Sequence, residues 1–124
     1  MEIRTKFGEI IINGEKFHED VIMDWNNKIF KRPKHLSAHK KKLYGHTPFT
    51  KDELLDIIKN IGKPDILVIG TGQYGALPIE EEVYLEARKL GITLLRDRTP
   101  NAIEIYLSQI KSNRKVIALF HITC

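Results

Sequence analysis

The chain has 124 residues, of which 42% are hydrophobic and 29% charged, and its formal net charge is +4. This length and composition suit one globular domain over residues 1–124 and exclude a disordered, charge-dominated chain. The single cysteine, Cys124, excludes an intrachain disulfide, and the chain shows neither the apolar stretch of a signal peptide nor a run of about 18 apolar residues. We therefore expect a cytoplasmic location and no membrane insertion.

The first third of the chain predicts an antiparallel β-meander. Residues 7–12 are rich in isoleucine, and Asn13-Gly14 is the dipeptide that best tolerates the positive φ angles of a tight hairpin turn. A second strand is expected over residues 17–25. Asn26-Asn27 then permits a reversal into a third strand over residues 29–32.

A basic connection follows the predicted meander. Residues 34–49 have no sustained hydrophobic period, and the window 25–51 holds eight Lys or Arg residues but no acid. All sixteen acids lie elsewhere in the chain. Such a segment is typical of a solvated surface loop, but it also attracts phosphates. RNA binding through residues 28–51 is therefore one hypothesis for the function.

The remaining residues predict helices and buried strands in alternation. The apolar runs that indicate strands cover residues 65–70, 92–96 and 115–122. A helix is expected before each strand. Thr50 and Glu53 form a capping box that begins the first helix. Pro78 begins the second helix, and Thr99 is the N-cap of a third that runs to about Ser112.

Right-handed crossovers through helices make such strands parallel. The predicted fold is a compact three-layer α/β domain, in which an N-terminal antiparallel β-meander is followed by α-β-α-β-α-β with parallel strands. Open sheets of this kind bind ligands at the carboxyl ends of their parallel strands. The candidate ligand or partner cleft at that edge consists of Gly70, Thr71, Gly72, Arg96, Arg98, Thr99 and His121.

The glycine-rich segment Gly70-Thr71-Gly72-Gln73-Tyr74-Gly75 has the spacing of a dinucleotide-binding loop. That site needs a helix N-terminus directly at the glycines, so that its free amides meet the pyrophosphate, whereas Pro78 indicates that the helix starts later. We therefore predict no tight NAD or NADP binding and no cofactor. A structural turn and a generic anion site are the two remaining interpretations, the second because arginines and free amides hold anions well.

Nucleophilic and metal-binding patterns are weak in this chain. His121 and Cys124 fall on opposite faces of a continuous strand, so we assign no catalytic residue. The five histidines lack the spacings of known metal sites, so no metal is expected. His46 and Cys124 remain further candidates, His46 only if its loop folds back over the sheet edge.

Several short sequence motifs occur in a characteristic order along the chain. They are Phe7-Gly8, Asn13-Gly14, Asp20-Val21, His46, residues 67–72, Gly91-Ile92, Thr99 with Ala102 and Tyr106, and the ending Phe120-His121-Ile122-Thr123-Cys124. In this order they resemble the Mth-type domain, the family called domain of unknown function 498, over nearly the whole chain. The resemblance implies a compact three-layer α/β fold and no particular reaction. One mitochondrial branch of that family is linked to the assembly of a large respiratory complex, which implies an accessory role.

The function expected from these observations is non-enzymatic. We expect a binding or assembly-accessory domain that recognises a protein segment or a small anionic ligand at the carboxyl edge of its sheet. The alternative is an enzyme acting on a small phosphorylated or carboxylated metabolite, with the arginines, the glycine amides and His121 in one cleft. Nucleic-acid binding is the third hypothesis.

Overall fold

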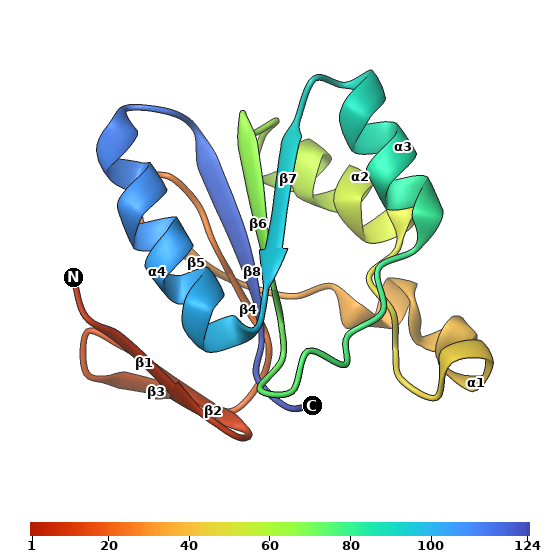
Figure 1. The fold of residues 1–124 in the computed structure, drawn as a ribbon, viewed down its shortest axis with the longest axis horizontal. Helices are drawn as coiled ribbons and strands as arrows, with labels where there is room; N and C mark the ends of the chain where they lie inside the picture. Colours follow the sequence, from red (N-terminus) through yellow and green to blue (C-terminus); the bar gives the residue numbers. More distant parts are fainter.

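The structure, a computed structural model, describes residues 1–124 as two β-sheets with helices packed on them (Figure 1). The small antiparallel sheet contains β1 (Ile3–Lys6), β2 (Glu9–Ile12) and β3 (Glu15–Phe17). The large sheet, in the order β5-β4-β8-β6-β7, contains β4 (Val21–Met23), β5 (Ile29–Lys31), β6 (Ile66–Thr71), β7 (Thr93–Asp97) and β8 (Val116–His121). This arrangement confirms the predicted α/β class.

The longer helices are α2 (Lys51–Asn60), α3 (Glu81–Lys89) and α4 (Thr99–Gln109). Short helical turns complete the fold: η1 (Lys34–Leu36), η2 (Ala38–Lys40), α1 (Lys41–Tyr44) and η3 (Ile110–Ser112). The basic segment, predicted as an irregular connection, therefore contains three consecutive short helices. None of the helices has the length and apolar character that crossing a bilayer demands.

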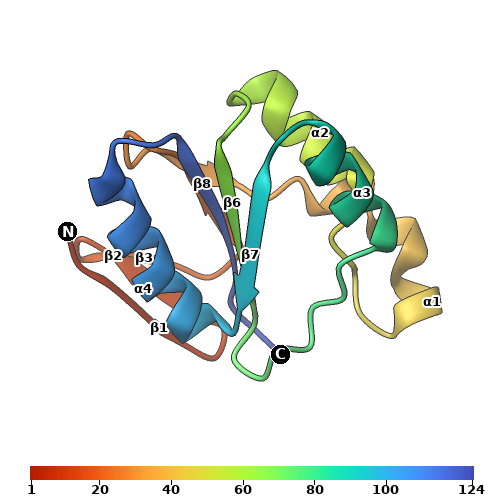
Figure 2. The same ribbon diagram turned by 45° about the horizontal axis from the view of Figure 1, so that its top comes forward.

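The predicted parallel strands are confirmed. β6 lies between β7 and β8 and pairs in parallel with both, whereas β4 joins β8 in the antiparallel direction. Helices α2 and α3 cover one face of the large sheet, and α4 with the small sheet covers the other (Figures 1 and 2). These are the three layers that the alternation of helices and strands predicts.

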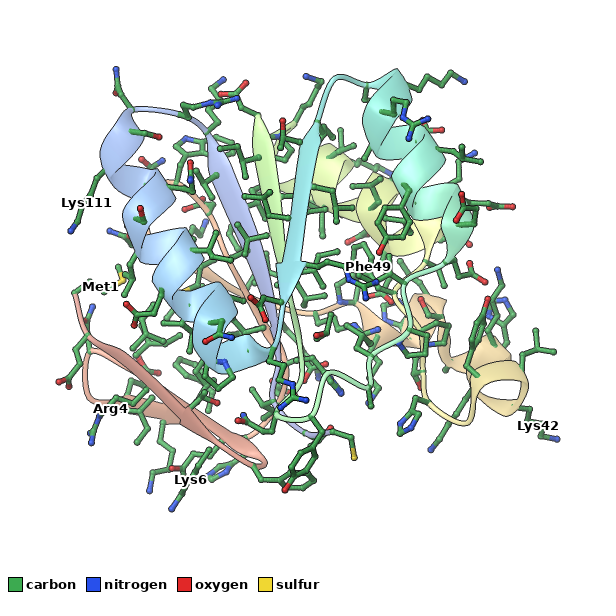
Figure 3. The ribbon with its side chains drawn as sticks, viewed as in Figure 1. Met1, Arg4, Lys6, Lys42, Phe49 and Lys111 are labelled. Atoms are coloured by element: carbon green, nitrogen blue, oxygen red, sulfur yellow. The ribbon has the colours of Figure 1, made fainter.

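Alternate residues of the central strands fill two separate cores. Ile66 and Val68 of β6 pack toward α4 and the small sheet, whereas Leu67 and Ile69 pack toward α2 and α3. Phe49, which precedes α2, is fully buried in the second core (Figure 3). Each fully buried side chain of this size stabilises the fold by about 1.5–3 kcal/mol. A strand covered on both faces needs apolar residues at every position, which explains the continuous apolar run in the sequence.

The predicted N-terminal antiparallel meander is present as the small sheet, but its strands are not the ones predicted. The Asn13-Gly14 hairpin is present, with positive φ at both residues, but it joins β2 to β3 in the small sheet. The predicted strand over residues 17–25 is broken after Phe17, and β4 belongs to the large sheet instead. The break occurs because the Asp20 carboxylate turns inward to bond the amide of Ile122 at 3.0 Å. The strand β1 was not predicted.

One helix start and one half of a capping box also differ from the prediction. α3 begins at Glu81 and not at Pro78, because the preceding residues are extended against Phe49, whose amide donates to the Pro78 carbonyl at 2.8 Å. The Thr50 hydroxyl caps α2 by accepting from the Glu53 amide. The Glu53 carboxylate does not return to complete the capping box, because it is buried in an ion pair described below.

Candidate functional site at the carboxyl edge

The three parallel strands end side by side. Thr71, the last residue of β6, is in register with His121 of β8, and Gly70 is in register with Asp97 of β7. The loop after β6, the start of α4 and the end of the chain meet at the bottom of Figure 1. We call this surface the carboxyl edge and define it as residues 70–76, 96–99 and 121–124.

The buried Thr99 side chain joins the three segments of the carboxyl edge. Its hydroxyl accepts a hydrogen bond from the Gly72 amide at 2.9 Å and donates one to the His121 carbonyl at 2.5 Å. The sequence predicted Thr99 as an N-cap, but the N-cap position of α4 is Arg98, and no side chain caps the helix. The prediction is wrong because the Thr99 hydroxyl bonds to two neighbouring segments and not to the amides of its own helix.

The amides of the glycine-rich loop are bonded within the protein. The Gly72 amide donates to Thr99 and the Gln73 amide to the Thr123 carbonyl at 2.7 Å. The amides of Tyr74 and Ala76 both donate to the main-chain oxygen of Cys124, each at 3.0 Å. The next two bonds run from Gly75 to the Gly72 carbonyl and from Leu77 to the Thr71 carbonyl. The free amides that the sequence suggested are therefore occupied by the chain itself.

The chain's own packing also explains the first two glycines of the loop. A Cβ atom at Gly72, where φ is +103°, would lie 2.6 Å from the main-chain oxygen of Cys124. A Cβ at Gly70 would lie 2.9 Å from the Thr99 hydroxyl oxygen. Because α3 begins only at Glu81, no helix N-terminus stands at these glycines. The glycines have the spacing of a dinucleotide loop, but here they allow other segments of the same chain to approach the backbone closely.

The two arginines of the carboxyl edge point toward different neighbours. Arg96 donates from Nη1 to the Tyr84 hydroxyl of α3 at 2.8 Å. The side chain of Arg98 lies beside Gly75, and its guanidinium has no hydrogen-bond partner within the protein. Both residues are exposed, and the neighbouring Asp97 carboxylate already accepts from the Arg98 amide at 2.7 Å. All side-chain donors of Arg98 are therefore available to a ligand, whereas Nη1 of Arg96 is already bonded to Tyr84.

An exposed aromatic pair adjoins these residues. Phe7 and Tyr74 are 56% and 68% exposed, and their ring centroids are 6.2 Å apart. Phe7 comes from the turn between β1 and β2, which is attached to the carboxyl edge because the Gly8 amide donates to the Ile122 carbonyl at 2.8 Å. Sequence reasoning did not select Phe7 or Tyr74 as site residues, because only the folded chain brings the two turns together.

A buried charge network lies behind His121, and sequence reasoning missed it. The Arg32 side chain, 1% exposed, bonds Glu53 through Nε at 2.8 Å and Nη2 at 2.9 Å, and it bonds Asp20 through Nη1 at 2.9 Å. Asp20 in turn bonds Nδ1 of His121 at 2.8 Å. The Ser37 hydroxyl donates to Glu53. These residues lie far apart in the sequence, so no local pattern indicated their pairing.

The network shifts the ionisation of its members. Burial raises the pKa of Asp20. The hydrogen bond and charge of His121, together with Arg32, lower the pKa by more than burial raises it, so that the pKa lies below its ordinary value. Burial acts against the charge of Arg32, but the bonds and charges of Glu53 and Asp20 more than offset that effect and raise the pKa of Arg32. Asp20 and Arg32 therefore hold their charges inside the protein.

His121 connects the network to Thr123, whose hydroxyl lies 3.2 Å from Nε2. A carboxylate, an imidazole and a hydroxyl in line resemble the groups of a hydrolase. Such an enzyme also requires free donors for an oxyanion and a pocket beside the nucleophile. The nearby amides are bonded internally, and none of the hollows described below reaches Thr123. We therefore assign Asp20, His121 and Thr123 a structural role and not a catalytic one.

The further candidates His46 and Cys124 lie apart from each other, and neither forms part of a metal site or of a pair of nucleophile and base. His46 is exposed and follows α1, which both views place away from the end of the chain (Figures 1 and 2). Cys124 is a partly exposed free thiol, and the His121 nitrogens are bonded to Asp20 and Thr123. No group of three His, Cys, Asp or Glu side chains is arranged to hold a metal ion.

Three hollows are present on the protein, and all lie outside the carboxyl edge. The basic hollow, about 440 Å³ in volume, is lined by Glu19, Lys31, Arg32, Lys34, His35, Ala38 and Thr47. A small hollow of about 60 Å³ is lined by Glu19, Asp20, Lys31, Arg32 and Lys34. The third, about 280 Å³, lies on the small sheet and is lined by Arg4, Thr5, Lys6, Glu9 and Ile11. Arg4 and Lys6 are marked in Figure 3.

The fold and the carboxyl edge define a three-layer α/β domain whose glycine loop is closed by its own last residues. A family model described as "Protein of unknown function (DUF498/DUF598)" matches residues 3–121. The chain belongs to this family, which confirms the resemblance found in the sequence.

Solved structures share the fold. The chain is similar to the conserved hypothetical protein PH1505 from Pyrococcus horikoshii OT3, with 26% identity, all of both chains covered and a TM-score of 0.83. It is also similar to a protein named MT938, with 25% identity over 98% of this chain and 96% of that one and a TM-score of 0.73. XCC1710 from Xanthomonas campestris, 15% identical over 98% of this chain and 83% of that one with a TM-score of 0.64, shares the fold alone. None of the curated proteins matches the chain.

Proposed function

We propose that this domain is a non-enzymatic binding domain that recognises a segment of another protein at its carboxyl edge, as an assembly-accessory domain does. The exposed pair Phe7 and Tyr74, with the Arg98 side chain lying beside Gly75 next along the loop, is the observation that carries the proposal. Aromatic residues and arginine are the side chains most enriched where proteins bind one another. The occupant is a peptide segment with an apolar or aromatic side chain and a carboxylate.

The occupied amides of the glycine loop favour a protein segment over a free small anion. An anion held at this surface has no free amides available among residues 72–77, so its binding depends on arginine side chains alone. An extended segment also gains from covering Phe7 and Tyr74, because removal of their exposed apolar surface from water is favourable.

The absence of a hollow at the carboxyl edge supports binding over catalysis. An enzyme for a small metabolite encloses its substrate in a pocket that contains an acid or base with a perturbed pKa. The carboxylate with the perturbed pKa near this edge, Asp20, is bonded to Arg32 and His121, and the hollow that it lines has a volume of only about 60 Å³.

Selection of short displayed peptides on the whole domain, followed by calorimetric titration of the selected sequences, tests the proposal. We expect selected peptides to share a carboxylate near an apolar residue. Arg98→Ala, and separately the double change Phe7→Ser with Tyr74→Ser, should each weaken their binding by about tenfold or more.

Leu85→Ser is the matched control, because Leu85 is 54% exposed on α3, outside the carboxyl edge. The control should bind the peptides as the unmodified domain does. Peptides whose affinity is unaffected by the edge variants, or equally reduced by the control, would overturn the proposal, as would a selection that yields no binding sequence.

A further inference from the structure

The basic hollow is a second candidate site, separate from the carboxyl edge. It lies at the end of β5 and the first short helices, and its charged and polar lining residues are Glu19, Lys31, Arg32, Lys34, His35 and Thr47. Its volume of about 440 Å³ falls within the range of about 300–1,000 Å³ typical of small-molecule sites. It is the largest of the three hollows.

The charged residues that line the basic hollow are the cations Lys31, Arg32 and Lys34 and the single acid Glu19. Because Arg32 is paired with the buried carboxylates of Asp20 and Glu53, the cations that an incoming anion meets unpaired by buried acids are Lys31 and Lys34. Glu19 lies 3.4 Å from Lys31, but these side chains are 56% and 74% exposed. Exposed pairs of this kind are weak, so an anion of higher charge competes for Lys31.

The Thr47 side chain provides an independent indication of a ligand. Thr47 is 8% exposed, and its carbonyl accepts from Arg32, but its hydroxyl has no hydrogen-bond partner within the protein. Every side-chain nitrogen or oxygen atom that is closed off from solvent does have a partner. The Thr47 hydroxyl must therefore reach solvent, and Thr47 is one of the residues that line the hollow. It is a donor held in place on an almost fully buried residue.

Arg32 holds the floor of the hollow rigid. Its guanidinium bonds Asp20, Glu53 and the carbonyl of Pro48 at 3.0 Å, so the chain segments that carry Lys31 and Thr47 are fixed relative to each other. A site whose groups are already in position loses less conformational entropy when a ligand binds.

We propose that the basic hollow binds the phosphate group of a small phosphorylated molecule. A phosphate monoester carries nearly two negative charges at neutral pH and three strong acceptor oxygens. Lys31 and Lys34 match its charge, and the Thr47 hydroxyl donates to one of its oxygens. A polymer such as RNA needs neither a hollow nor a hydroxyl on an almost fully buried residue, and it would contact the exposed lysines of α1 as well.

Titration of the whole domain with inorganic phosphate and with phosphoserine, followed by NMR chemical shifts and calorimetry at low salt, tests the proposal. We expect the largest shifts at residues 31–38 and 47. Lys34→Gln and Thr47→Val should each weaken binding by about tenfold, because each removes a charge or a donor from the phosphate. Thr47→Ser, which retains the hydroxyl, should restore binding and keeps the test valid if the valine variant fails to fold.

Lys41→Gln is the matched control, because Lys41 is exposed in the same basic segment but does not line the hollow. It should leave phosphate binding unchanged, as should Arg98→Ala, so failure of this site and failure of the peptide site are distinguishable. Equal losses from Lys34→Gln and Lys41→Gln, with tighter and steeply salt-dependent binding of a single-stranded oligonucleotide, would overturn the proposal in favour of diffuse polyanion binding. Absence of any shift at millimolar phosphate would also overturn it.

Discussion

The carboxyl edge and the basic hollow use similar groups in opposite ways. At the carboxyl edge, the amides of the glycine loop and the Thr99 hydroxyl are all bonded to the protein. At the basic hollow, the Thr47 hydroxyl is unbonded and two lysines face a single acid. The glycine-rich motif, which resembles a ligand site in sequence, therefore stabilises the fold here, whereas the segment that resembles a plain surface loop helps to line the largest of the three hollows. The difference depends on which donors the chain itself satisfies.

The buried charge network between these two regions should produce the largest effect on stability. Arg32→Ala leaves the carboxylates of Asp20 and Glu53 buried without their partner, which should lower the free energy of unfolding by about 3–5 kcal/mol. Denaturant unfolding followed by circular dichroism measures this change. Lys31→Ala, one residue away but exposed, should change the same quantity by less than about 0.5 kcal/mol. A loss below about 1 kcal/mol for Arg32→Ala would show that the network does not fix the two regions.

The glycine loop should be the next most sensitive. Gly72→Ala combines a positive φ with overlap on the main chain of Cys124, which should cost roughly 2–4 kcal/mol of stability. Gly75→Ala is the matched control, because Gly75 also has positive φ but a Cβ there would have its nearest neighbour at 3.5 Å. That control should cost about 1–2 kcal/mol. Thermal unfolding of both variants separates the contribution of backbone conformation from that of close packing, and equal losses would contradict the structural role assigned to Gly72.

The pH dependence of stability should show the smallest effect. The pKa of Asp20 is lower in the folded protein than its ordinary value of 3.8, so the folded carboxylate binds its proton less readily than the unfolded one. This contribution to stability is fully present above the unfolded pKa and is lost as pH falls through the folded pKa. Urea unfolding between neutral pH and pH near the folded pKa should therefore show a smaller acid-induced loss for Asp20→Asn than for the unmodified domain. Identical pH profiles would contradict the charged state of Asp20.

The sequence determined the elements whose signals are local. The Asn13-Gly14 turn, the Thr50 cap and the apolar runs of β6 and β8 depend on residues that are neighbours in the chain, so their conformations follow from backbone preferences and hydrophobic period. The shared direction of β6, β7 and β8 also followed, because right-handed helical crossovers make such strands parallel.

Only the tertiary structure decided which polar groups satisfy one another. Asp20 meets His121 across 101 positions of the chain, Arg32 meets Glu53 across 21, and Cys124 meets the amides of the glycine loop. Glu53 illustrates the conflict, because its local role in a capping box was displaced by pairing with a buried guanidinium. A buried charge without a partner costs far more than an incomplete helix cap, so packing of distant segments overrode the local pattern.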